Sequence, residues 1–297
     1  MKVKQKKSAL LPGLITVLMV VAAVAGGLRM TDPDGGRLDT MRLETITAEN
    51  EGLTAQVEAL RTETAEQKAL PEAIQKQKDE GFRLLGELER QIKAGESDKR
   101  IAYLTFDDGP YDNTTDAILD ILKEKGVHAT FFLRHRPDHV AQIQREIREG
   151  HTLANHSYSH KIKAVYQSAD SCIKEIRDQQ KWLTETVGIT PEIYRFPGGS
   201  PTAGNKKQAI AAALAADGLG YVDWNCYTGD GLPGVLTTEK AYQNAVSSVG
   251  EQKIVVMLMH DYSAATLEAL PDIIDTLKAK GYMMMPLFRE SVMIRSA

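Results

Sequence analysis

The sequence has little cysteine and no excess of basic charge. Its 297 residues include two cysteines, Cys172 and Cys226, without the CxxC spacing of thiolate sites, so a cysteine metal centre is not expected. The two thiols could pair in one disulfide if the chain is exported, and two buried free thiols are an equally good alternative. The net charge of −4 and the pI near 6.0 give no indication of a nucleic-acid partner.

Internal repeats and low-complexity tracts are absent too, and one long apolar run stands at the N-terminus. Leu10–Leu28 contains 19 residues without a charge, and residues 1–9 before it include four lysines. Such a run can span a bilayer, and basic residues before it place the following chain outside the cell. We therefore expect a cytoplasmic basic tail over 1–9 and a single-pass anchor over 10–28. A cleaved signal peptide, which would give a secreted protein, is the alternative because Ala23-Val24-Ala25 fits a cleavage site.

Residues 29–98 are expected to form a linker and a helical stalk that follows the anchor. A heptad pattern with an Asn at one core position predicts a two-stranded coiled coil, and hence a homodimer through the stalk. A helix that folds back on the C-terminal domain is the alternative. Beyond Pro71, the stretch Glu72–Lys93 predicts a second helix. The core positions of the heptad pattern are Leu43, Ile46, Asn50, Leu53, Val57, Leu60, Thr64 and Gln67.

Residues 99–297 alternate short apolar strands with amphipathic helices. This alternation indicates an α/β domain with a parallel sheet wrapped by helices. About seven strands in this length favour a small (β/α)7 barrel, with an open doubly wound sheet as the alternative. The expected strands are Ile101–Phe106, His128–Leu133, Thr152–Asn155, Ile193–Phe196, Gly220–Trp224, Ile254–Met259 and Tyr282–Leu287. The expected helices are Thr114–Lys125, Asp138–Glu149, Ala169–Val187, Lys206–Ala216, Thr238–Val249 and Ala265–Lys280.

Ionisable side chains follow five of these strands, at the point where each strand ends. Because the carboxyl ends of the strands meet at one edge of a barrel, we expect these side chains to share one site. They are Asp107 and Asp108, His156 and His160, Arg195, Asp230, and His260.

Two imidazoles and a carboxylate from this set could hold a metal ion. His156 and His160 are four residues apart, so on a helical turn they would share one face, although such a pair alone is usually a surface coincidence. Asp108 would add an oxygen ligand and complete a catalytic zinc set with a position left for water. Zn²⁺ is therefore the expected cofactor, with Co²⁺, Mn²⁺ or Ni²⁺ as alternatives.

These residues stand in motifs that resemble those of the polysaccharide deacetylases, the NodB-homology family of carbohydrate esterases. The motifs are Thr105-Phe-Asp-Asp-Gly109, His156-x-x-x-His160, Arg195-x-Pro197 and Leu258-x-His260, and the resemblance covers Lys99–Leu287. It implies a distorted barrel and a metal-dependent hydrolysis of N-acetyl groups on sugars, carried out by a catalytic domain over residues 99–297.

The resemblance also implies roles for single residues. Asp107 would be the general base, Arg195 would hold it in place, and His260 would be the general acid. The family often has Asp-x-x-Asp-Trp where this chain has Tyr227-Thr-Gly-Asp-Gly231, so only the second Asp is kept. We expect Asp230 to orient His260, with Asp223 as its rival.

Four further residues are expected to contact substrate. By the resemblance, Leu258 would line the pocket for the acetyl methyl group, and the backbone N–H of Tyr111 would assist the oxyanion. Pro197 belongs to the third motif. Gly231 replaces a Trp that is common in the family, and Trp224 would partly substitute for it.

The favoured substrate is the N-acetylglucosamine of peptidoglycan, because an anchor and a stalk would present the domain to the cell wall. Exopolysaccharide and chitin oligomers are alternatives within the same chemistry. A metal-dependent amidase acting on small cyclic amides and a non-catalytic wall-binding scaffold are alternatives of other classes.

Overall fold

The computed structural model describes residues 80–291 and 293–296. The predicted basic tail, membrane anchor and coiled coil, and the start of the second predicted helix, lie outside these residues. Within them, no helix combines the length and the apolar character needed to cross a bilayer.

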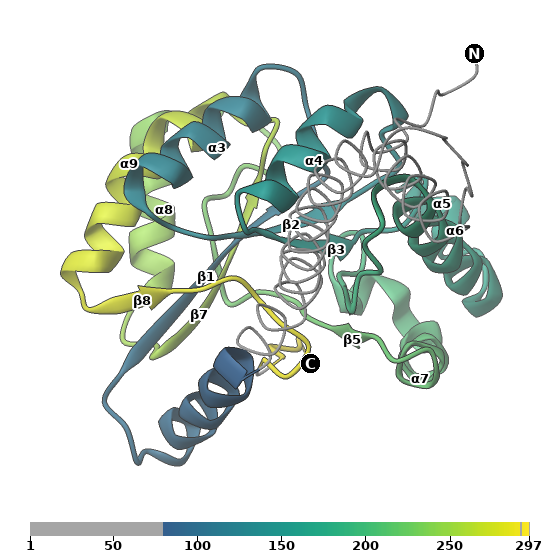
Figure 1. The fold of residues 1–297 in the computed structure, drawn as a ribbon, viewed down its shortest axis with the longest axis horizontal. Helices are drawn as coiled ribbons and strands as arrows, with labels where there is room; N and C mark the ends of the chain where they lie inside the picture. The colour runs from purple at the N-terminus through teal and green to yellow at the C-terminus, as the bar shows by residue number, and fades with distance from the viewer. Residues whose placement is uncertain (1–79, 292, 297) are drawn as a thin grey trace, which may run out of the picture. The chain divides into compact units, whose positions relative to one another are not determined.

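One curled sheet of parallel strands forms the centre of the described part (Figure 1). Its strands are β1 (Arg100–Asp107), β2 (Thr130–Leu133), β3 (Thr152–Asn155), β4 (Ile193–Tyr194), β5 (Gly220–Tyr221), β6 (Cys226–Tyr227), β7 (Ile254–His260) and β8 (Tyr282–Met284). They lie in the order β5-β4-β3-β2-β1-β7-β6, and β8 pairs with β1. There is room for β8 because β2 pairs with the last residues of β1, Thr105–Asp107, whereas β8 pairs with the first, Arg100–Ala102.

Helices surround the outer side of this sheet (Figure 1). They are α3 (Thr114–Lys125), α4 (Val140–Arg148), α5 (Ile162–Val165), α6 (Ala169–Val187), α7 (Lys207–Ala216), α8 (Thr238–Val249) and α9 (Ala264–Ala279), with 3-10 turns η1 (Pro137–His139) and η2 (Ser200–Lys206). Local signals set their ends. A capping box of Ser168 and Ser171 begins α6 and a left-handed Gly188 ends it, so its bounds equal those predicted.

The α/β class and the parallel sheet are confirmed, and the number of strands differs from the prediction. Strand β6 has two residues, which is too short to leave a pattern in the sequence. Among the described residues no ladder joins β5 to β6, so the sheet is a curled half-barrel, where we expected a distorted (β/α)7 barrel.

The two faces of β1 pack into different cores. Ala102, Leu104 and Phe106 face the outer layer, where they belong to one cluster with side chains of α3 and α9. Ile101 and Tyr103 point to the inner face and belong to a second cluster. Burial on both faces is typical of a parallel strand at the centre of a covered sheet.

A helix over residues 80–94, drawn in blue in Figure 1, packs against this inner core. Leu85 and Ile92 are buried in it, Phe82 stacks on Phe288 with ring centroids 4.9 Å apart, and Tyr103 Oη donates to the buried Glu89 carboxylate. The compact unit therefore begins at Glu80, whereas we expected residues up to 98 to belong to the stalk.

Both cysteines are free and buried, so the alternative of two thiols is the one observed. Cys172 Sγ lies 3.7 Å from Tyr194 Oη, and Cys226 Sγ donates to Ser248 O at 3.3 Å. Burial raises the pKa of Cys172 to about 11 and that of Cys226 to about 12, which keeps both as inert thiols.

Candidate active site

Strand β1 delivers two adjacent carboxylates to the carboxyl end of the sheet. Asp107 ends the strand in register with His260 of β7, so both side chains leave the same inner face. Asp108 follows with a φ of 79°, so its backbone is no longer extended and its side chain does not continue the alternation of side chains along β1. Gly109 then passes so close to Asp261 that a Cβ atom would lie 1.9 Å from Asp261 Oδ2. Only glycine fits at this position.

Asp108, His156 and His160 converge as expected for a metal centre. Their candidate ligand atoms all lie within 4.8 Å of one another. Asp108 Oδ1 lies 3.4 Å from His160 Nε2 and 3.9 Å from His156 Nε2. That oxygen is buried and has no hydrogen-bond partner, which a coordinated cation would supply.

The chemistry of these donors fits a divalent cation. His156 Nδ1 lies 2.8 Å from Arg195 O, and a carbonyl oxygen only accepts, so Nδ1 carries the proton and Nε2 offers a lone pair. Burial, followed by the neighbouring His156, lowers the pKa of His160 to about 4. For Asp108, burial raises the pKa, but His156, His160 and Arg134 together bring it below its usual value. Both groups thus favour their deprotonated, ligating forms.

The segment from His156 to His160 is a loop, so the two rings do not meet by the helical spacing considered above. Positive φ values at Ser157 (69°) and His160 (56°) bring the two rings together, with centroids 4.8 Å apart. Asn155 Oδ1 accepts from Ser157 N at 2.9 Å, and Ser157 Oγ accepts from His160 N at 3.1 Å. Glu175 on α6 accepts from the Ser159 amide at 2.6 Å. Sequence analysis missed Asn155 and Glu175, and only the position of Asn155 at a strand end was a signal.

Arg195 is fully buried and fixes Asp107. Its Nη1 donates to Asp107 Oδ1 at 2.8 Å and to Thr105 Oγ1 at 2.7 Å. Nη2 donates to Asp223 O at 3.1 Å, and the guanidinium lies 4.0 Å from the centre of the Phe132 ring. The second oxygen of Asp107, Oδ2, lies 3.6 Å from His156 Nε2 and so faces the metal cluster.

His260 is oriented by Asp230. Its Nδ1 lies 2.8 Å from Asp230 Oδ1, its backbone N–H donates to Asp230 Oδ2 at 2.8 Å, and Thr266 Oγ1 donates to the same oxygen at 2.7 Å. Burial lowers the pKa of His260, but the hydrogen bond and charge of Asp230, together with the charges of Asp107 and Asp108, outweigh burial and leave the pKa raised. The rival Asp223 accepts instead from Ser200 N at 2.8 Å and Oγ at 2.6 Å.

The Tyr111 amide has a hydrogen-bond partner at the start of α3, and its role at the oxyanion stays a prediction. Its N–H donates to Thr115 Oγ1 at 2.8 Å, and that hydroxyl donates to Asp261 Oδ2 at 2.6 Å. Burial raises the pKa of Asp261 to about 7. Thr115 and Asp261 were not predicted from the sequence. Their hydrogen bonds fix the backbone at Tyr111.

The other expected substrate residues differ in exposure. Leu258 and Trp224 are half-buried, as pocket-lining side chains are. Pro197 is buried, and its carbonyl accepts from Tyr166 Oη at 2.9 Å, so it holds the loop. Gly231 lets the His260 ring approach, because a Cβ atom there would lie 2.7 Å from His260 Cε1.

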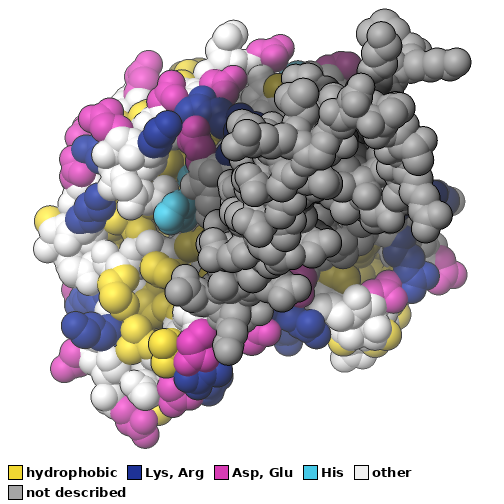
Figure 2. Space-filling model, in the orientation of Figure 1, with side chains coloured by type: hydrophobic (Ala, Val, Ile, Leu, Met, Phe, Trp, Pro, Cys, Tyr) yellow, Lys and Arg dark blue, Asp and Glu magenta, His cyan; other side chains and the backbone are white. Residues whose placement is uncertain are grey.

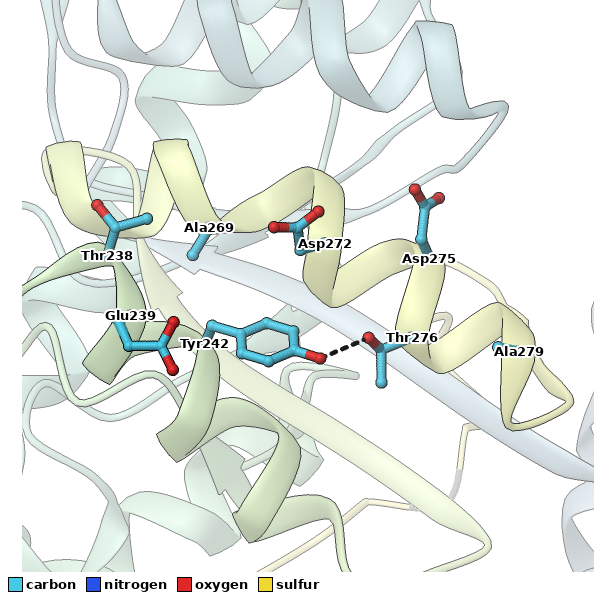
Figure 3. Close-up of a pocket in the computed structure, with 8 residues that line it drawn as sticks. All are labelled: Thr238, Glu239, Tyr242, Ala269, Asp272, Asp275, Thr276 and Ala279. Atoms are coloured by element: carbon cyan, nitrogen blue, oxygen red, sulfur yellow. Dashed lines mark hydrogen bonds between the residues drawn. The ribbon is translucent and has the colours of Figure 1, made fainter.

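A separate hollow of about 520 Å³ lies between α8 and α9 (Figure 3). Glu239, Asp272 and Asp275 carry acidic groups around it, and Tyr242 Oη lies 3.0 Å from Thr276 Oγ1 across it. It contains none of the residues described above.

Figure 2 shows acidic and basic side chains interspersed over the visible face of the described part, with no segregation of charge there.

Comparison with known proteins agrees with this geometry. A family profile described as polysaccharide deacetylase matches residues 94–219. The putative polysaccharide deacetylase YheN of Bacillus subtilis is 36% identical over 205 residues, which are 65% of this chain and 68% of that protein. The chain belongs to the polysaccharide deacetylase family.

Two further relatives of this polysaccharide deacetylase carry a narrower name. The peptidoglycan-N-acetylglucosamine deacetylase of Bacillus cereus is 30% identical over 65% of this chain and 71% of its own length. The catalytic domain of peptidoglycan N-acetylglucosamine deacetylase from Eubacterium rectale superposes with a TM-score of 0.63 at 35% identity, covering 67% of this chain and 93% of that one. Membership of the family makes this chain a metal-dependent hydrolase of acetylated polysaccharide.

Proposed function

We propose that this protein removes N-acetyl groups from the N-acetylglucosamine of peptidoglycan and releases acetate. The observation that carries the proposal is the Asp108–His156–His160 cluster, with Asp107 and His260 leaving the same inner face beside it. This set supplies a metal centre, a base and an acid, which are the parts that amide hydrolysis needs.

Residues of this chain can be assigned to each proton transfer. Asp107, held at Oδ1 by Arg195, would take the proton of the attacking water at Oδ2. His260, whose Nδ1 faces Asp230, would give a proton from Nε2 to the departing amine. A divalent cation held by Asp108, His156 and His160 would polarise the acetamide carbonyl and lower the pKa of a bound water.

Peptidoglycan is favoured as substrate on two grounds. The relatives from Bacillus cereus and Eubacterium rectale are named for it, and the predicted anchor over 10–28 would hold the domain at the outer face of the cell membrane. Zinc is the proposed metal because two imidazoles and one carboxylate are a common catalytic zinc set. Exopolysaccharide and chitin oligomers are the alternative substrates.

The test measures acetate release by the purified protein from peptidoglycan, chitin oligomers and acetylated exopolysaccharide, with and without a chelator. We expect release from peptidoglycan that chelation abolishes and zinc restores. Asp108→Ala should lose both metal and activity. Asp107→Asn should keep its metal, while kcat falls ~10²–10⁴-fold because the base is lost.

The control variant is Asp138→Asn, which removes an exposed carboxylate on η1 and should change neither quantity. If Asp107→Asn lost the metal and Asp108→Ala kept it, the roles of Asp107 and Asp108 would be exchanged. A fully metallated protein that binds the wall but releases no acetate from any glycan would instead support a non-catalytic scaffold.

A further inference from the structure

Two arginines from the segment after β2 flank Tyr111 beside the metal cluster. Arg134 Nε lies 3.5 Å from Asp108 Oδ1, and its Nη2 donates to Tyr111 Oη at 3.4 Å. The guanidinium of Arg136 lies over the ring of the same tyrosine, 4.2 Å from its centroid. Tyr111 therefore joins both guanidinium groups into one cationic rim next to Asp108.

The side chain of Arg136 differs from that of Arg145 in its partners within the part of the chain that the structure describes. Among the described residues no carboxylate lies within ion-pair distance of it, and its buried Nε has no hydrogen-bond partner. Arg145, by contrast, contacts Asp116 at 3.0 Å, Asp120 at 2.5 Å and Glu149 at 2.9 Å. The Arg145 side chain therefore links α3 to α4, whereas the contact recorded for the Arg136 side chain within the described part is the face of the Tyr111 ring.

This arrangement is suited to binding an anion. Stacking on Tyr111 restricts Arg136 without using the N–H donors at the edge of its guanidinium plane. Those donors match the two oxygens of a carboxylate in a bidentate pair. Arg134 adds a second positive charge on the side nearer the metal cluster. A cation bound at Asp108 would neutralise the carboxylate that faces Arg134, which would leave the Arg134 charge available to an anion.

We propose that Arg134, Arg136 and Tyr111 form a subsite for a carboxylate carried by the glycan, one sugar away from the acetamido group that reacts. The subsite selects an acidic glycan strand over a neutral one. In a wall glycan the matching group is the lactyl carboxylate of a neighbouring muramic acid residue that carries no stem peptide, because a stem peptide converts that carboxylate into an amide. The inference rests on the proposed function and narrows its substrate class.

The test compares three substrates with the metallated full-length protein. They are wall glycan strands stripped of their peptides, the same strands with the carboxylates converted to amides, and neutral chitin oligomers. For the wild type, we expect the KM for the carboxylate strands to be the lowest of the three and to rise with salt. Arg136→Gln should reduce the preference for carboxylate over amidated strands about tenfold, the loss expected for a hydrogen-bonded charge pair.

Two matched variants sharpen the result. Arg148→Gln removes the same charge from an exposed position at the end of α4 and should leave the preference unchanged. Arg136→Lys keeps the charge without the planar fork and should give an intermediate preference.

An equal loss on all three substrates would show that Arg136 only supports the loop and would overturn the subsite. A wild type that does not distinguish amidated from carboxylate strands would overturn it as well. Each of these results requires acetate release, so failure of the proposed function itself would be seen separately, as no release at all.

Discussion

Asp107 and Asp108 are neighbours in the chain with different surroundings. Asp107 keeps the alternation of β1 and points inward, where Arg195 Nη1 holds one of its oxygens at 2.8 Å. Asp108 leaves the strand with a φ of 79° and lies among the two histidines. Two identical side chains can therefore serve as a base and as a ligand because a single backbone angle separates their directions.

The Asp230–His260 pair gives a prediction about pH. An imidazole whose pKa is raised stays protonated, and competent as an acid, to a higher pH. Asp230→Asn removes the hydrogen bond and the charge that raise the pKa of His260 most, while the effect of burial remains, so the pKa of His260 should fall. The alkaline limb of kcat/KM should therefore move to lower pH.

The measurement is the pH profile of acetate release, with metal content and thermal stability recorded for each variant. Asp138→Asn serves again as the exposed control and should keep the wild-type profile. Suppose that Asp230→Asn keeps its metal and its melting temperature and still shows the wild-type pH profile. That result would show that Asp230 does not set the pKa of His260.

At the scale of elements, the helix over residues 80–94 is part of the domain that follows it. It presents neighbouring leucines to different surroundings, since Leu85 is 7% exposed and Leu84 is 54% exposed. The inner core that it contacts also contains Tyr103 of β1 and Phe288 of the C-terminal segment. The inner side of the sheet is thus covered by two segments from outside the β-α alternation.

This packing predicts unequal effects of the same substitution at adjacent positions. Leu85→Ala should destabilise the protein by ~2–5 kcal/mol, because it removes buried methyl groups and leaves a cavity. Leu84→Ala should change the free energy of unfolding by less than ~0.5 kcal/mol, as exposed positions usually do. Equilibrium denaturation of a chain that begins at Glu80 measures both values, and equal effects would mean that this helix is not docked in solution.

At the scale of the whole molecule, the position of the enzyme relative to the membrane is the remaining prediction. If residues 10–28 are an uncleaved anchor, the full-length protein should sediment with membranes at full mass and resist extraction by salt. A cleaved signal peptide would instead give a soluble protein whose mature chain begins at Gly26, after Ala23-Val24-Ala25. Fractionation followed by N-terminal sequencing distinguishes the two.

The sequence alone determined what depends on local interactions and on short spacings. The bounds of α3, α6 and α8 equal those predicted from the sequence pattern. Side-chain caps at Ser168 and Thr237 begin α6 and α8, and such caps are local to the helix end. The three candidate metal ligands followed from strand ends, because parallel strands bring their carboxyl ends to one edge.

Only the tertiary structure decided which distant groups meet. It paired Asp230 with His260 where the sequence left Asp223 as a rival, and it occupied the Tyr111 amide with Thr115. It also brought Arg136 over Tyr111, 25 positions earlier in the chain. Such contacts leave no periodic trace, since they depend on how loops from separate strands pack over one another, and that is set by the whole sheet and its two cores.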